Sequence, residues 1–253
     1  FAGSSLVERN TVQQTQAKKR QQQQLELKKK LTKQEPEESV ASFQVEPLAI
    51  EIGYGLIPLV DNTIENSLMD RIVSIRRQIA KELGILISPV RIRDNLYLDS
   101  NGYSIKIRGN EVTKGKIYPD KFMIIAQNDG HFPFKGIPTK DPAFHLDALW
   151  INAQDKEQAE LQNFTIIEPL TVIATHLKEV INKHAPELLG RQEVKKLLEG
   201  IKGQSGVVID ELIPDIMRLG EVEKVLQNLL AEQIPINDLA TVSYTHLTLP
   251  TKA

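Results

Sequence analysis

The hydrophobic periodicity of this sequence begins near Val45, and that boundary decides which part of the chain can fold. Upstream, the stretch from Arg9 to Lys33 is rich in glutamine and carries eight basic side chains against one acidic side chain, Glu26. A segment with so few apolar residues cannot bury enough surface to offset the conformational entropy lost on folding. We therefore predict a flexible, basic and glutamine-rich linker over residues 1–44.

The charge of this linker leaves other uses open. Its eight bases and one acid give a local charge of +7, against −2 for the whole chain of 253 residues. Such an arm suits an anionic membrane surface or nucleic acid, so a nucleic-acid-binding protein with a basic N-terminal arm is the alternative of another class. No aromatic side chain lies among the bases to stack on nucleotides, which disfavours that alternative.

The first half of the folded region has the pattern of a mixed α/β fold. Alternating apolar residues predict strands around 48–52 and 103–107, and a shorter one over 90–93. Ser67 and Asp70 have the spacing of a capping box, followed by a helical stripe that ends at Gly84. That stripe contains Leu68, Ile72, Ile75, Ile79 and Leu83.

The sequence pattern changes in the second half of the folded region. Short strands over 122–126, 149–151 and 164–167 surround a polar helix over 155–162, and residues 128–142 are crowded with glycine and proline, which predicts a long loop. This region is interpreted as a small inserted α+β subdomain. After Pro169, apolar stripes predict three helices over 169–181, 194–201 and 222–230, the second ended by Gly203.

Catalytic chemistry is not evident, and we predict no enzyme activity, cofactor or metal site. The sequence has no cysteine, which excludes a thiol nucleophile and thiolate zinc sites. Residues 109–116 have the wrong glycine spacing for a phosphate loop. His176 and His184 lie about 12 Å apart along one helix, too far to share a metal. Asp141 and His145 have the spacing of a pair, and a structural hydrogen bond is favoured over half a catalytic triad.

One further group of charged residues is interpreted as structural. Arg91, Arg93 and Asp94 are interpreted as a surface ion-pair cluster. No stretch approaches the roughly 18 consecutive apolar residues of a membrane-spanning helix.

Six segments of the chain together form a recognisable series over about residues 45–241. They are VEPLAIEIGYGLIPLVD (45–61), VRIRDN (90–95), DPAF (141–144), ATHL (174–177), ELLGRQEV (187–194) and VLQNLLAEQIPINDL (225–239). In this order they resemble the cytoplasmic domain of the FHIPEP family of flagellar type III export-gate proteins.

The resemblance implies an α/β plus α fold built from subdomains. A thioredoxin-like subdomain is expected over 45–119 and 169–188, with a ferredoxin-like α+β subdomain inserted over 120–168. An incomplete helical subdomain follows over 189–241, and the family's fourth subdomain is expected to be absent. Residues 242–253 resemble the translation of a sequencing adaptor, so we predict that they are a read-through artefact.

The resemblance also implies a function. Family members are multi-pass proteins of the bacterial inner membrane whose cytoplasmic domains form a nonameric ring and dock export chaperones with bound substrates. Expected partners include these chaperone complexes, components of the export ATPase complex and other export-gate membrane proteins; nucleic acid is not expected. A virulence-type export-gate homologue is the alternative within this class. The expected location is the cytoplasmic face of that membrane.

Four residues match functional positions of the family. Asp141, Phe144 and Thr175 match the docking site for chaperone–substrate complexes, where Phe144 would act as an apolar anchor and the other two would fix orientation. The alternative is that Phe144 is a core residue and Asp141 caps the turn at Pro142. Gly53 matches a position associated with domain motion, and its alternative role is a strand terminator with positive φ.

Overall fold

The computed structural model describes residues 45–60, 67–125, 132–200 and 217–239. The predictions for the linker over 1–44, for the helix end at Gly203 and for the tail over 242–253 lie outside the described residues. The described region is a mixed α/β fold with two sheets and several helices, as the sequence patterns predict.

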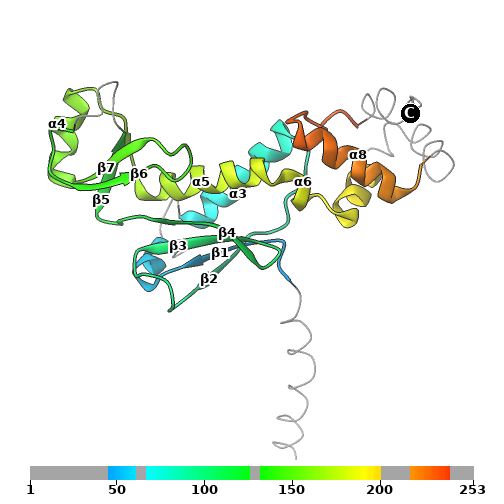
Figure 1. Ribbon diagram of the computed structural model, residues 1–253, viewed down its shortest axis with the longest axis horizontal. Helices are drawn as coiled ribbons and strands as arrows, with labels where there is room; N and C mark the ends of the chain where they lie inside the picture. The colour runs from blue at the N-terminus through cyan, green and yellow to red at the C-terminus, as the bar shows by residue number, and fades with distance from the viewer. Residues whose placement is uncertain (1–44, 61–66, 126–131, 201–216, 240–253) are drawn as a thin grey trace, which may run out of the picture. The chain divides into compact units, whose positions relative to one another are not determined.

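The first sheet is built on the most strongly alternating part of the sequence. Its strand order is β2-β1-β3-β4, with β1 and β2 parallel and the other pairs antiparallel (Figure 1). The predictions of β1, β2 and β3 are confirmed. The strands are β1 (Leu48–Ile52), β2 (Arg91–Asp94), β3 (Gly102–Ile107) and β4 (Asn110–Lys116).

Strand β4 was not predicted, and the glycine before it and the glycine within it have structural roles. Arg108 and Gly109 have φ of 48° and 83° and form the two-residue turn between β3 and β4, a conformation typical of tight hairpins. Gly115 lies opposite Tyr103 in the register, and a Cβ there would come within 2.6 Å of the Tyr103 ring. The glycines that resemble a phosphate loop therefore serve a hairpin and a close packing contact.

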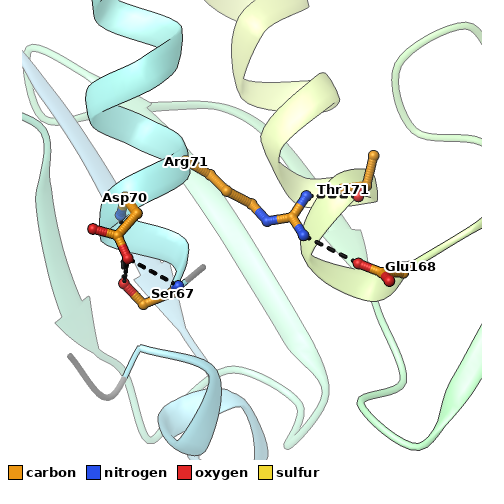
Figure 2. Close-up of polar contacts among 5 residues, drawn as sticks. All are labelled: Ser67, Asp70, Arg71, Glu168 and Thr171. Carbon is orange, nitrogen blue, oxygen red and sulfur yellow. Dashed lines mark hydrogen bonds and ion pairs between the residues drawn. The ribbon is translucent and has the colours of Figure 1, made fainter. Parts of the chain in front are cut away.

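Two amphipathic helices, α3 (Leu68–Glu82) and α5 (Pro169–Lys183), lie along one face of this sheet (Figure 1). The capping box is confirmed, because the Asp70 N–H donates to Ser67 Oγ and the Ser67 N–H donates to Asp70 Oδ2. Figure 2 shows Arg71 reaching from α3 to the start of α5, where it donates to Thr171 Oγ1 at 2.7 Å and to Glu168 Oε2 at 3.1 Å. These contacts fix α5 beside α3.

The second sheet is fully antiparallel with the order β6-β7-β5-β8. Its own small core contains Ile124, Leu149, Ile151 and Ala159. The prediction of a loop throughout 128–142 is wrong in part, because 137–140 pairs with β7. This edge position tolerates Pro138, which cannot donate a ladder hydrogen bond. The elements are β5 (Lys121–Ile125), β6 (Ile137–Lys140), β7 (Asp147–Asn152), η2 (Ala153–Asp155), α4 (Lys156–Leu161) and β8 (Ile166–Ile167).

The helical region after α5 shares the main core with the first sheet. One buried cluster extends from Leu48 in β1 to Leu239 near the end of the described chain. The Ile236 N–H donates to the Leu83 carbonyl at 2.9 Å, and Gly84 ends α3 with a φ of 79°, as expected. The remaining described elements are η1 (Tyr54–Leu59), α6 (Ala185–Leu188), a helical stretch over 191–200 and α8 (Leu219–Ala231).

Candidate binding site at the β6–β7 turn

The candidate site is built on the turn that joins strands β6 and β7. The Asp141 N–H donates to the Leu146 carbonyl at 2.8 Å, which extends the hairpin beyond its last strand pair. The His145 N–H donates to the Asp141 carbonyl at 2.8 Å, and His145 has a positive φ of 59°. Two backbone hydrogen bonds therefore stabilise the turn formed by residues 141–146.

The Asp141 side chain adds two hydrogen bonds inside the same turn. Its Oδ2 accepts from the Ala143 N–H at 3.1 Å and from the Phe144 N–H at 2.6 Å. Only 3% of Asp141 is exposed. This Asx-type capping is what aspartate does at turns, and the prediction that Asp141 caps the turn at Pro142 is confirmed.

Phe144 lies at the exposed side of this turn. It is 56% exposed, and Leu146 is 48% exposed, so the alternative that Phe144 is a core residue is wrong. Thr175 lies on α5 and is half-buried. An exposed aromatic side chain on a hydrogen-bonded turn is suited to enter a hydrophobic pocket of a partner protein.

A buried polar group connects α5 to the first sheet. His176, next to Thr175 on α5, shares a hydrogen bond of 2.8 Å between its Nδ1 and the Tyr103 hydroxyl. Its Nε2 lies 3.3 Å from Thr113 Oγ1 on β4. We name Tyr103, Thr113 and His176 the Tyr–His network.

Burial determines the protonation of this network. Desolvation lowers the pKa of His176 to about 4, against the opposing effect of the Asp141 carboxylate, and nearby His145 lowers it further. Burial also raises the pKa of the Tyr103 hydroxyl well above its usual value, with a smaller contribution from Asp141. Both rings are therefore neutral at pH 7.

The sequence patterns did not reveal the Tyr–His network. Tyr103 and His176 are 73 positions apart in the chain, and only the packing of α5 on β3 and β4 brings them together. The one available signal was that Tyr103 stands at an inward position of an alternating strand.

Close packing, and not backbone conformation, requires a glycine at position 53. Its φ is −69°, so the alternative of a positive-φ strand terminator is wrong. Its N–H donates to the Gly102 carbonyl at 2.8 Å, and a Cβ there would lie 2.0 Å from the Asp99 carbonyl oxygen. The segment from Asp99 to Gly102 thus packs directly on the Gly53 backbone.

The other sequence candidates have separate partners. His184 Nδ1 hydrogen-bonds to Glu187 Oε1 at 2.8 Å. Arg91 and Arg93 both form ion pairs with Glu46, so their acidic partner is Glu46 and not the predicted Asp94. Asp141 and His145 meet through their backbones. Within the described ranges, no three acidic or histidine side chains lie in a group that could hold a metal ion.

Solved structures define the class of protein to which this fold belongs. The Chlamydia pneumoniae CdsV protein superposes with a TM-score of 0.69 and 25% identity, covering 79% of this chain and 59% of that chain. The nonameric EscV cytosolic domain from the type III secretion system gives a TM-score of 0.58 at 19% identity, covering 83% of this chain and 60% of that chain. The fold is that of type III export-gate cytoplasmic domains.

Sequence comparison gives the family. The FHIPEP family profile matches residues 1–250, and the flagellar biosynthesis protein FlhA of Bacillus subtilis (strain 168) is 42% identical over 210 residues. The chain belongs to the FHIPEP family. That alignment covers 83% of this chain and 31% of the relative, so the chain spans about a third of the curated relatives' length. None of the helices within the described ranges has the length and apolar character needed to cross a membrane.

Proposed function

We propose that this chain is part of a flagellar type III export gate and provides the surface on which export chaperones dock with their substrates. The observation that carries the proposal is Phe144, which is 56% exposed on a hydrogen-bonded turn at the position that matches the family's docking motif. An exposed aromatic anchor held by its own backbone loses little conformational entropy on binding.

The chemistry of the site suits a protein partner with an apolar contact surface. Phe144 and Leu146 supply exposed apolar area, and the half-buried Thr175 supplies a hydroxyl for orientation. We assign no catalytic step to the site. Its role is binding, and the flagellar relatives favour the flagellar system over the virulence-type alternative.

The subdomain organisation belongs to the same proposal. A thioredoxin-like subdomain over 45–119 and 169–188 is supported by the order β2-β1-β3-β4 with one parallel pair. A ferredoxin-like insert over 120–168 is supported by the antiparallel order β6-β7-β5-β8, which is the strand order of that fold. The helical subdomain would then begin at 189.

Family membership supports two further parts of the proposal, the assembly and the location of the complete protein. The solved EscV cytosolic domain is a nonamer, which supports a nonameric ring for the complete protein. We place the domain at the cytoplasmic face of the bacterial inner membrane, with components of the export ATPase complex and other gate proteins as further partners. Gly53 is proposed as a hinge, and the packing of Asp99 on its backbone is the contact that such a motion would change.

Titration of the full chain with a purified flagellar chaperone–substrate complex tests the proposal. Phe144→Ala is expected to weaken binding at least tenfold, since anchor residues dominate interface energetics, and Thr175→Ala is expected to weaken it about threefold through loss of one hydrogen bond. The matched control is Leu161→Ala, an apolar truncation at a side chain 85% exposed on α4. Wild-type binding by Phe144→Ala would refute the site.

A further inference from the structure

We infer that Asp141 is a positioning residue for docking: its carboxylate holds the β6–β7 turn that presents Phe144, and does not itself contact the partner. The inference rests on the proposed function and assigns a different role to Asp141 from the one that the family motif implies. Two observations carry it: the burial of Asp141 and its bonds within the turn.

Asp141 offers a partner almost no surface. It is 3% exposed, whereas Phe144, three residues later, is 56% exposed. Among the described residues, no lysine or arginine forms an ion pair with Asp141, although the neighbouring Lys140 and Asp147 pair with each other at 2.8 Å on the surface.

One oxygen of the carboxylate, Oδ2, bonds to the turn itself. Oδ2 accepts from the N–H groups of Ala143 and Phe144, and hydrogen bonds to an ionised acceptor are about twice as strong as neutral ones. The second of these fixes the backbone of the residue that carries the anchor. Without the acceptor, both N–H groups lose their hydrogen-bond partner. Fewer hydrogen bonds then stabilise the turn in which His145 adopts a positive φ.

The test compares Asp141→Asn with Asp141→Ala, because asparagine keeps an acceptor oxygen but removes the charge. Titration of each full-chain variant with a flagellar chaperone–substrate complex should give a dissociation constant within about threefold of wild type for Asn, and at least a tenfold loss for Ala. Amide hydrogen exchange of the free protein should be faster at Ala143 and Phe144 in Asp141→Ala than in Asp141→Asn. A change in the salt concentration should affect the binding of wild type and Asp141→Asn equally.

Two results would overturn the inference. If Asp141→Asn loses as much binding as Asp141→Ala while its exchange at Phe144 stays slow, the charge contacts the partner directly. If Asp141→Ala binds like wild type, the capping bonds do not matter for docking. Phe144→Ala separates this failure from that of the proposed function, because wild-type binding by Phe144→Ala refutes the docking site itself.

Discussion

Glycines at two positions of the first sheet are required by what packs against them. Gly53 accommodates the Asp99 carbonyl, and Gly115 accommodates the ring of Tyr103, which in turn holds His176. In both cases a side chain would occupy space that another group already fills. The requirement is therefore steric, and it comes from residues distant in the sequence.

Substitution of Gly53 provides a direct measurement of this requirement. In Gly53→Ala the new Cβ would lie 2.0 Å from a backbone oxygen, so the chain must shift, and the free energy of unfolding should fall by about 1–3 kcal/mol. Gly200→Ala is the matched control, since a Cβ there has no atom within 4 Å, and it should leave stability unchanged or raise it by up to about 1 kcal/mol. Urea denaturation measures both, and equal stability of the two variants would contradict the account.

At the level of elements, strong periodicity predicted the structure and weak periodicity did not. Helix α3 and strands β1 and β3 bury one regular face, and the sequence patterns identify them. Strands β4 and β6 lie at sheet edges, where Gly115 and Pro138 interrupt the alternation. Their pairing depends on a neighbouring strand, which local sequence does not describe.

The packing of α5 on the first sheet should depend on pH through His176. Its pKa is about 4 in the folded protein and 6.5 in an unfolded chain, so the unfolded state binds the proton first as the pH falls. The free energy of unfolding should therefore decrease from pH 6.5 to 4, by at most roughly 3 kcal/mol from this group.

Comparison with His176→Asn isolates that effect from other titrating groups. Asparagine can still hydrogen-bond to the Tyr103 hydroxyl but does not titrate. Chemical denaturation at several pH values should give a flatter stability curve for the variant between pH 6.5 and 4. Parallel curves for the two proteins would mean that His176 titrates normally in the folded state.

At the scale of the whole molecule, the residues of the candidate site come from two parts of the fold, the β6–β7 turn of the second sheet and helix α5. The motif match selected Asp141, Phe144 and Thr175 from the sequence and gave both Asp141 and Thr175 an orienting role. The structure shows an exposed Phe144 side chain and a buried Asp141. That difference depends on how the turn folds back on itself, with the N–H groups of Ala143 and Phe144 donating to Asp141 Oδ2, which the local sequence pattern does not describe.

Site-directed photo-crosslinking tests most directly whether the exposed turn is the docking surface. A benzophenone amino acid in place of Phe144, in the full chain mixed with a flagellar chaperone–substrate complex, should form a covalent adduct with that complex on illumination. The same group in place of Leu161, which is 85% exposed on α4, should form little or none. Equal adducts at both positions, or none at position 144 under conditions where the complex binds, would contradict the account.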